Sequence, residues 1–555
     1  MKLSLTSSRL LIFLFLAVIF VSALFTIDNP DTGFHLATGK YVAMTHSVPL
    51  YDVFSYTGNG ARLIAHYWLS DLIFYLFYVL AGYWGVIVIV ALMAAITYGV
   101  LISTARLHSK DLPLTLLLMI IFAEFTTRVW PFWIARPQIF GYLMAALMIF
   151  VLEKWRLNGN RKLLWWLFPI FVIWANTHAS VILGILIVML YAGVYALKNI
   201  LSLKNHIAEI AILAASIFAT LINPNGYKVL TYSFYIAQVV KQLGIFEWQS
   251  IIVYLFAIKA TIELAFIIAA GGCVLAFLIF NIIKKRDAQW EWLALASAAV
   301  ILPLLSVRHT GFFPILIFPI FVAVSDKFLS AKGISFDSLK YKNILAAIFG
   351  FIFLAIYIFQ VFPLEKINGN VIPVGAANFI RQEKVAGPIF NTLGDGGYLM
   401  WALWPDYKIF FDGRSEVYIG TPANDYQTIM QVKNGWENLL DDKYKINIAI
   451  LPSIVPTTSG EPVRSDLILA QKLAKERGFI LVYWDDASMV LVRHTAQNKK
   501  IIDEYGYGII GPYNAPQYIP SGDSVRAAQE IARAMKVAPD SAMIARYAQV
   551  FMATH

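Results

Sequence analysis

Acidic and imidazole side chains gather in one stretch of this chain, between residues 26 and 71. The stretch contains Asp28, Asp31, Asp52, His35, His46 and His66. The first two acids follow directly on an apolar run long enough to span a membrane, where a spanning helix needs no acid. A carboxylate can take the proton of an attacking hydroxyl group, and two carboxylates with an imidazole can bind a divalent cation. This stretch is therefore the leading candidate for a functional site.

Further polar residues stand at the ends of later apolar runs. They are Glu124, Arg136, Asn176, His178, Asn223, Arg308 and His309. Ionisable residues at membrane depth are costly and commonly mark sites or pathways. Each also has an ordinary explanation, because an arginine can reach the membrane surface and Asn176 can cap a helix.

The composition indicates a polytopic α-helical membrane protein. Hydrophobic residues make up 59% of the 555 residues, and the mean hydropathy is +0.66. The net charge of +10 does not indicate nucleic-acid binding, because the basic residues form short clusters between apolar runs. The only cysteine, Cys273, excludes an intrachain disulfide. The N-terminal apolar run continues to Thr26 with no small-residue cleavage site in reach, which favours a retained signal anchor.

Eleven apolar runs are long enough, or nearly so, to cross a membrane. They cover residues 9–26, 84–105, 112–128, 137–153, 163–177, 179–197, 206–222, 262–283, 290–306, 311–325 and 343–362. The run 68–81 has 14 residues and contains Asp71, so we expect it to be interfacial or re-entrant. If this run does not cross, fifteen basic residues of the later loops lie on one side of the membrane and six on the other. The positive-inside rule places the N-terminus in the cytoplasm and the polar helix ends outside, with the first loop.

We expect three parts along the chain. Residues 1–362 form the membrane domain, with a large first outer loop at 27–83. Residues 363–505 alternate strand-like and helix-like segments, which predicts an extracytoplasmic α/β domain. Strands are expected at 387–391, 407–412, 446–452, 478–484 and 488–493, and G-D-G-G-Y (394–398) is expected to be a turn that opens a helix. Residues 506–555 combine a linker with a tetratricopeptide-like helical pair, expected to dock on the α/β domain.

Three soluble-enzyme motifs are absent from the sequence. It contains no G-x-x-x-x-G-K-[ST], G-x-S-x-G or H-E-x-x-H, which argues against an ATP-driven transporter. A transporter or flippase would also carry ionisable residues in a helix bundle, but repeated halves are not evident. A non-catalytic assembly protein of a cell-envelope glycan pathway is the third alternative, and it would need no acid pair in the first loop.

The first-loop pattern D-T-G-F-H-L-A-T-G-K-Y…P-L-Y-D-V-F-S-Y-T…A-H-Y-W-L-S-D resembles that of bacterial membrane proteins of the GT-C glycosyltransferase superfamily. R-P-Q-I-F, W-A-N-T-H-A-S, N-P-N-G and V-R-H-T-G-F-F-P resemble later outer-face motifs of that group. G-D-G-G-Y-L-M-W-A-L-W-P-D-Y-K-I-F-F-D-G-R-S-E-V-Y resembles the core of its outer domain. The resemblance covers residues 9–498.

The resemblance implies an inverting sugar transfer from a polyprenyl-phosphate donor at the outer face of the bacterial cytoplasmic (inner) membrane. It implies a first-loop aspartate as base, with Asp31 the first choice and Asp28 the second. Positive charge for the leaving phosphate would come from Arg136, Arg308 and His309. His35 and His178 would donate hydrogen bonds to phosphate or sugar.

Other assignments stay open. His66 and Asn176 are expected to contact the acceptor or to be structural. Asp412 and Arg414 are expected either to face the membrane site or to form a structural ion pair. Asp28, Asp31 and His35 would hold a divalent cation if one binds. The expected partners are the lipid bilayer, the lipid-linked donor, an acceptor that is a glycan, lipid or protein, and a protein bound through the C-terminal helical pair.

Overall fold

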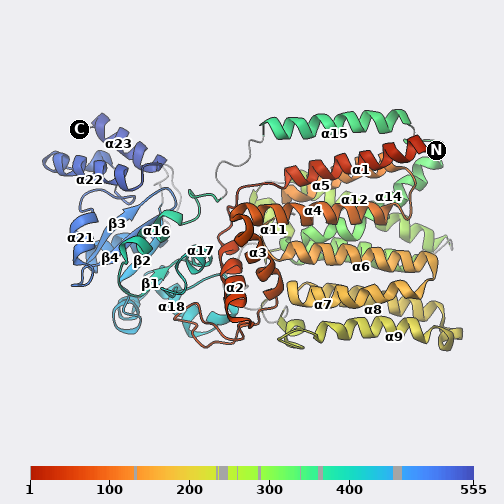
Figure 1. Cartoon of the computed structure of the whole chain (residues 1–555), viewed down its shortest axis with the longest axis horizontal. Helices are drawn as coiled ribbons and strands as arrows, with labels where there is room; N and C mark the ends of the chain where they lie inside the picture. The colour runs from red at the N-terminus through yellow and green to blue at the C-terminus, as the bar shows by residue number, and fades with distance from the viewer. Residues whose placement is uncertain are drawn as a thin grey trace. The chain divides into compact units, whose positions relative to one another are not determined.

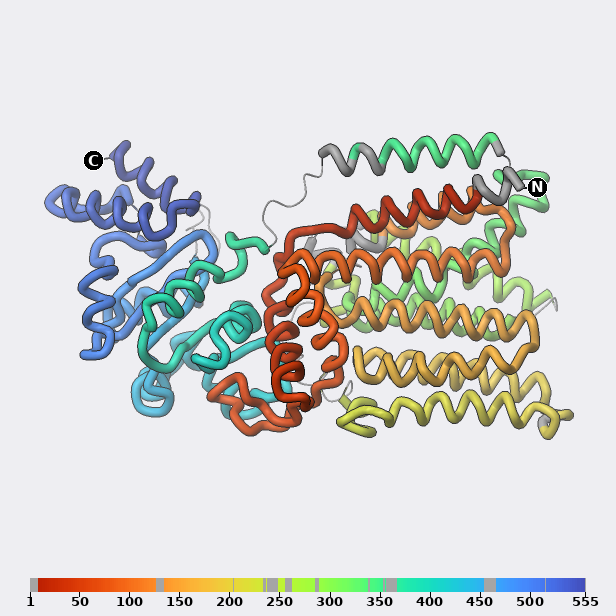
Figure 2. Tube along the Cα trace, in the orientation of Figure 1, coloured from red at the N-terminus to blue at the C-terminus, as the bar shows by residue number. Residues whose placement is uncertain are grey.

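The computed structural model describes residues 2–129, 134–232, 236, 248–258, 261–284, 289–337, 339–359, 367–453, 465–514 and 516–554. The chain forms two compact units, which Figure 2 traces by residue number. The first unit contains residues 1–25 and 64–364, and the second contains residues 26–63 and 365–555. The expected boundary at 362–363 lies outside the described residues. The first loop, expected to belong wholly to the membrane domain, is divided between the two units.

The first unit is helical because a segment surrounded by lipid must satisfy every backbone hydrogen bond within itself. Figure 1 shows its long helices side by side, and α3 running across their direction. The helices are α1 (Lys2–Ser22), α3 (Trp68–Ala81), α4 (Tyr83–Ala105), α5 (Leu112–Val129), α6 (Gln138–Asn158), α7 (Leu167–Thr177), α8 (Val181–Lys198), α9 (Ile207–Phe218), α11 (Ile251–Ile258), α12 (Thr261–Ile283), α13 (Trp290–Leu305), α14 (Phe312–Ser330) and α15 (Leu339–Phe359).

Six helical segments of the described residues are long and apolar enough to cross a membrane. They are Tyr83–Ala105, Gln138–Asn158, Val181–Lys198, Lys204–Leu221, Ile262–Ile283 and Val307–Ser330. Shorter apolar helices occupy three of the five other expected spans, at Ser8–Ser22, Leu112–Phe125 and Trp290–Leu305. The chain is thus an integral membrane protein with several spans, and the count of eleven stays a prediction.

The helix α3 has 14 residues. At a rise of about 1.5 Å per residue it is about 21 Å long, which is shorter than the roughly 30 Å apolar core of a bilayer. It packs on α4 and α7, with Asp71 fully buried in its first turn. Its length therefore agrees with the expectation that this segment does not cross.

The second unit contains a four-stranded sheet in the order β1-β2-β4-β3. The strands are β1 (Ile389–Asn391), β2 (Ile448–Pro452), β3 (Phe479–Trp484) and β4 (Ser488–Arg493). The β1–β2 pair is parallel and the other two pairs are antiparallel. The surrounding helices are α2 (Asp31–Thr45), α16 (Val374–Glu383), α17 (Leu393–Leu403), α18 (Thr421–Met430), α20 (Ser465–Glu476) and α21 (Lys499–Tyr505). The region thus combines a mixed sheet with helices, and a separate extracytoplasmic α/β domain at 363–505 stays a prediction.

Two local expectations for this unit were wrong. Residues 407–412 do not join the sheet: Ile409 forms an isolated bridge with Ser55, and the side-chain amide of Asn391 bonds the backbone of Phe410 and Phe411. These partners occupy the backbone groups that a strand would use. The G-D-G-G stretch is not a turn, because it lies inside α17, whose N-terminus is capped by Thr392.

The C-terminal helices α22 (Ser524–Val537) and α23 (Ala542–Thr554) pack on the second unit. Glu530 accepts backbone N–H bonds from Gly508, Ile509 and Ile510 at 2.9–3.1 Å. Tyr547 packs edge-on against Trp484, with ring centroids 5.5 Å apart. The pair is therefore anchored by a buried carboxylate and an aromatic contact, while its protein-binding role stays a prediction.

Candidate active site

Asp31 is the first residue of α2 in the second unit. Pro30 occupies the N-cap position without a side-chain bond, and the Asn29 Oδ1 atom accepts the Asp31 N–H at 2.9 Å. Asp31 is therefore the first helical residue and does not cap the helix. Its side chain is half-buried, whereas Asp28 is exposed. A half-buried carboxylate at the start of a helix can accept a proton from a bound hydroxyl.

The helix α2 packs directly on α17, and the closest approach is between backbone atoms. A Cβ atom added at Gly33 would lie 2.4 Å from the Gly397 carbonyl oxygen, so only glycine fits there. His35, one turn along α2, is 4% exposed, with its ring 4.0 Å from that of Phe34. Within the described part of the chain, Asp28, Asp31 and His35 do not form a three-member metal-binding group.

Arg414 forms a buried ion network with two aspartates. Its Nη1 donates to Asp52 Oδ1 at 2.7 Å, its Nε to Asp412 Oδ1 at 2.8 Å and its Nη2 to Asp412 Oδ2 at 2.5 Å. Tyr418 donates a further bond to Asp412 Oδ2 at 2.5 Å. Burial opposes the charge, but the carboxylates of Asp412 and Asp52 outweigh it and hold the pKa of Arg414 well above its ordinary value.

This network matches the structural alternative that the sequence left open for Asp412 and Arg414. Asp52 is the partner that sequence reasoning did not assign. It lies in the first loop, where it also accepts bonds from the backbone and hydroxyl of Ser55. The motif P-L-Y-D-V-F-S-Y-T drew attention to this aspartate, but no sequence pattern linked it to Arg414.

In the first unit, His66, His178, Tyr232 and Arg308 form a group that we call the imidazole cluster. The His66 ring lies 4.2 Å from the ring of Tyr232 and 6.5 Å from that of His178. The Arg308 guanidinium carbon lies 4.9 Å above the ring of Trp248. The cluster brings together three of the residues that the sequence singled out, and adds Tyr232, which no motif marked.

Both imidazoles of the cluster are neutral at pH 7. Burial lowers the pKa of His66 to about 4, with the charge of Arg308 acting in the same direction. Burial also lowers the pKa of His178 well below its ordinary value, helped by His66 and Arg308. Neither imidazole therefore adds a second positive charge beside Arg308, and the guanidinium carries the charge of the cluster.

Hydrogen bonds fix the tautomer of each imidazole. His66 Nδ1 lies 3.0 Å from the Ile64 carbonyl oxygen, which only accepts, so Nδ1 carries the proton and Nε2 is an acceptor. His178 Nδ1 accepts the Ser180 N–H at 3.1 Å, so its Nε2 carries the proton and is a donor. The cluster therefore offers one imidazole donor, one imidazole acceptor and one guanidinium.

The remaining sequence-derived residues of the first unit differ in their surroundings. Asn176 accepts a bond from Trp68 Nε1 at 2.7 Å and donates to the carbonyl oxygens of Val172 and Ile222, which are the contacts of a structural residue. His309 is half-buried beside Arg308. Arg136 is half-buried two residues before α6 begins.

An apolar groove of about 640 Å³ lies between α8 and α13. Its lining includes Leu183, Leu190, Leu293 and Leu302. The two helices are antiparallel, because Lys198 at the end of α8 pairs at 2.7 Å with Glu291 at the start of α13. The start of α8 therefore lies beside the end of α13. His178 precedes the start of α8 by three residues, and Arg308 follows the end of α13 by three residues.

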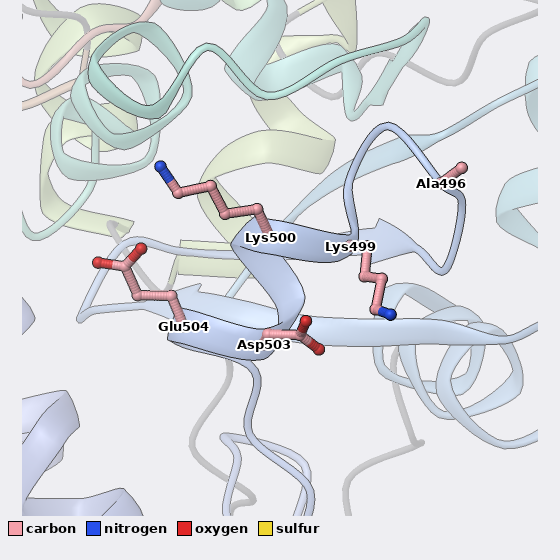
Figure 3. A pocket seen from close by; sticks show the side chains of 5 residues that line it. All are labelled: Ala496, Lys499, Lys500, Asp503 and Glu504. Carbon is pink, nitrogen blue, oxygen red and sulfur yellow. The ribbon is translucent and has the colours of Figure 1, made fainter.

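A second hollow lies on the surface of the second unit, around α21 (Figure 3). Its lining residues are Ala496, Lys499, Lys500, Asp503 and Glu504. The four charged side chains are exposed, and the two lysines precede the two acids by four residues along one helix. This hollow is an ordinary charged surface and contains no sequence-derived site residue.

Comparison with protein-family models and with curated proteins gave no match. Among solved structures, the Archaeoglobus fulgidus oligosaccharyltransferase with a tethered acceptor peptide has a TM-score of 0.50 at 11% identity, covering 88% of this chain and 74% of that one. The same enzyme, AglB, with an inhibitory peptide and a dolichol-phosphate gives 0.50 at 10% identity and the same coverages. ArnT from Cupriavidus metallidurans gives 0.47 at 13% identity, covering 85% of this chain and 95% of that one.

Both proteins are GT-C membrane glycosyltransferases. The likeness to the oligosaccharyltransferase shows that this chain shares its fold, which confirms the resemblance derived from the first-loop and outer-face motifs. At this level of identity the likeness extends to the fold alone.

Proposed function

We propose, proceeding from this shared fold, that the chain is a membrane glycosyltransferase that uses a polyprenyl-phosphate-linked sugar. Asp31 takes the proton of the acceptor hydroxyl while the acceptor oxygen forms a bond to the anomeric carbon. The bond from that carbon to the phosphate oxygen breaks, and the polyprenyl phosphate leaves with the electron pair. A single displacement of this kind inverts the anomeric configuration.

The observation that carries the proposal is the arrangement of α8 and α13. These two helices line the apolar groove, and His178 and Arg308 lie three residues beyond their adjoining ends. A polyprenyl-phosphate sugar needs these two environments in one continuous site, because its chain is apolar and its phosphate is anionic. The groove thus supports a lipid-linked donor more directly than a water-soluble sugar nucleotide.

The imidazole cluster suits the phosphate end of such a donor. Arg308 supplies a planar guanidinium that can bind two phosphate oxygens. A neutral His178 can donate from Nε2 without adding charge that would retain the leaving group too tightly. His66, with Nε2 as an acceptor, can take a bond from a sugar hydroxyl. Arg136 and His309 are proposed as further contacts to the head group.

The outer face of the bacterial cytoplasmic membrane is the proposed place of reaction, with the N-terminus in the cytoplasm and the C-terminal domain outside. The acceptor is a hydroxyl or amide of a glycan, a lipid or a protein. Asp28 is the second candidate for the base, but its exposure makes it the weaker one.

The test uses the purified full chain in proteoliposomes with radiolabelled polyprenyl-phosphate hexoses and pentoses. Membrane lipids, glycan fragments and peptides are supplied as acceptors, and product is separated by chromatography. Asp31→Asn, which keeps the size of the side chain, should lower turnover by about a hundredfold to ten-thousandfold. Asp28→Asn is made in parallel, and a loss of turnover in that variant alone would place the base at residue 28. If neither substitution changes turnover, the first loop is not the catalytic centre and the proposal fails.

A further inference from the structure

The residues around Asp31 come from distant parts of the sequence. A methyl group added at Gly413 would lie 2.9 Å from Asp31 Oδ1 and 3.5 Å from Phe34 Cε1. A methyl group at Gly397 would lie 2.7 Å from the Pro30 carbonyl oxygen and 3.2 Å from Asp31 Cα. Asp31 therefore lies against backbone on two sides, with its carboxylate toward Gly413 and its main chain against α17.

Both surfaces are held in place independently of Asp31. Gly413 lies between Asp412 and Arg414, whose side chains are locked in the buried network with Asp52. Gly396 precedes Gly397 in α17 and faces the other way. A Cβ atom added at Gly396 would lie 2.9 Å from Asp412 Cα, which is too close for a side chain. The consecutive glycines thus let α17 touch the 411–412 backbone with one residue and the 30–31 backbone with the next.

We propose that Gly413 and Gly397 are positioning residues for Asp31, so that the D-G-R turn and the G-D-G-G helix complete the catalytic centre. This inference rests on the proposed function, in which Asp31 is the base. It assigns a specific task to the C-terminal region: to hold the carboxylate in the orientation that accepts the proton. Any side chain at position 413 would turn the carboxylate away from that orientation.

The two glycines differ in what their replacement displaces. At Gly397 the added methyl group meets backbone atoms, so Gly397→Ala shifts α2 as a whole. At Gly413 it meets side-chain atoms only, so the fold is kept and the Asp31 carboxylate must rotate. Misplacement of a catalytic group by about 1 Å can cost on the order of a hundredfold in rate. Gly413→Ala therefore isolates the positioning effect.

The experiment measures transfer from the polyprenyl-phosphate sugar that the wild-type protein turns over in the proteoliposome assay. Gly413→Ala should lower kcat by about tenfold to a hundredfold and leave the KM for the donor unchanged. Gly394→Ala is the matched control, because this glycine lies in the same α17 motif with open space around its Cβ position. Thermal unfolding in detergent should be the same for both variants within a few degrees.

A double-mutant cycle shows whether Gly413 acts through Asp31. In the Asp31→Asn background, Gly413→Ala should cause no further loss of the residual rate. If Asp31→Asn abolishes transfer while Gly413→Ala behaves like Gly394→Ala, the positioning inference is overturned and the proposed function stands. If Asp31→Asn is fully active, the proposed function itself has failed.

A second measurement needs no substrate. Cys273 is the only cysteine, so Asp31→Cys in a Cys273→Ser background carries a single reactive thiol. Adding Gly413→Ala should slow its reaction with N-ethylmaleimide severalfold, because the methyl group fills the space beside the thiol. Adding Gly394→Ala should leave the rate unchanged. Equal rates in all three proteins would exclude Gly413 as part of the wall around position 31.

Discussion

Arg414 Nη1 donates a 2.7 Å hydrogen bond to Asp52 Oδ1, and both side chains are completely buried. The two residues are 362 positions apart, one in the first loop and the other in the C-terminal region. Burying three charges requires that each be paired, because an unpaired buried charge costs several kcal/mol. The Arg414 guanidinium therefore holds the first loop and the C-terminal region together through one buried carboxylate from each.

Loss of the guanidinium should unfold this unit at a lower temperature. Arg414→Ala leaves Asp52 and Asp412 buried together without a cation, and we expect a loss of about 3–5 kcal/mol in the free energy of unfolding. Arg414→Lys should recover only part of this, because one ammonium group cannot reproduce the forked bonds to both carboxylates. Thermal unfolding of the purified protein, followed by intrinsic fluorescence, gives the comparison.

Lys408→Ala is the matched control for that prediction. Lys408 Nζ bonds Asn59 at 2.8 Å and so joins the same two segments, but at an exposed position. Exposed polar contacts contribute about 0–1 kcal/mol. An Arg414→Ala protein as stable as Lys408→Ala would show that the buried network contributes little.

Arg308→Ala should weaken donor binding more than it slows chemistry. The substitution removes the charge of the imidazole cluster and the stacking on Trp248. Charge-assisted hydrogen bonds to a phosphate contribute about 1.5–3 kcal/mol, so the KM for the lipid-linked sugar should rise by about tenfold to a hundredfold. Initial rates across donor concentrations measure this, with Arg308→Lys expected to lie between. An unchanged KM would remove Arg308 from the phosphate site.

Acid should destabilise the first unit through His66. Its pKa is about 4 in the fold, against an ordinary value of 6.5. Between these values the unfolded chain binds a proton that the folded chain does not, so the free energy of unfolding falls as the pH is lowered. The loss in the free energy of unfolding caused by His66 reaches about 3 kcal/mol below pH 4. It vanishes above about pH 6.5.

Melting temperatures measured from pH 4 to 7 test this directly. His66→Asn cannot titrate at this position, so the melting temperature should depend less steeply on pH. The remaining dependence includes that of His178. His46→Asn is the control, because His46 is exposed and ends α2 in a left-handed conformation that asparagine accepts. Equal slopes for wild type and His66→Asn would contradict the assigned neutral state.

The sequence allowed the helical membrane class and the α/β region to be predicted, because both depend on local patterns. Continuous apolar runs specify helices in lipid whatever their neighbours are. Alternating short strands and amphipathic helices specify an α/β domain in the same way. The strand expected at 407–412 failed because its partners, Ser55 and the Asn391 side chain, are decided by tertiary packing.

Contacts between distant segments were the part that the sequence could not supply. Motifs drew attention to Asp31 and to G-D-G-G, but no local pattern places Gly397 against Pro30 or Asp52 against Arg414. The role of each glycine follows from which backbone approaches it, and that is a property of the folded chain. Tyr232 was missed for a similar reason, since an aromatic residue in an apolar chain carries no distinguishing signal.

Thiol labelling from outside intact cells should report the orientation in the membrane. The charge asymmetry predicts that a cysteine near Gly159 is shielded and that one in the N-P-N-G loop reacts. Asn225 is buried, so Tyr227→Cys, at a residue 65% exposed, is the better outer reporter, and Asn158→Cys is the inner one. Both are made in the Cys273→Ser background. Labelling of Asn158→Cys by an impermeant maleimide would reverse the assignment.

Filling the groove between α8 and α13 should exclude the lipid chain of the donor. Ala298 lines the groove and is half-buried, so Ala298→Trp places an indole in the space that the polyprenyl chain is proposed to occupy. We expect the KM for the polyprenyl-phosphate sugar to rise at least tenfold, because several buried methylene groups at about 0.8 kcal/mol each would be displaced. The same loss should be smaller for a donor with a short prenyl chain.

Met189→Trp is the control for this last prediction, because Met189 lies on α8 at an exposed position that does not line the groove. It adds an indole of the same size to the other helix of the pair, α8, so a general effect on membrane insertion would appear in both variants. The two variants should have the same expression level and the same melting temperature. If Ala298→Trp and Met189→Trp give the same KM as wild type, the donor chain lies elsewhere, and Arg308 would have to bind its phosphate without the groove.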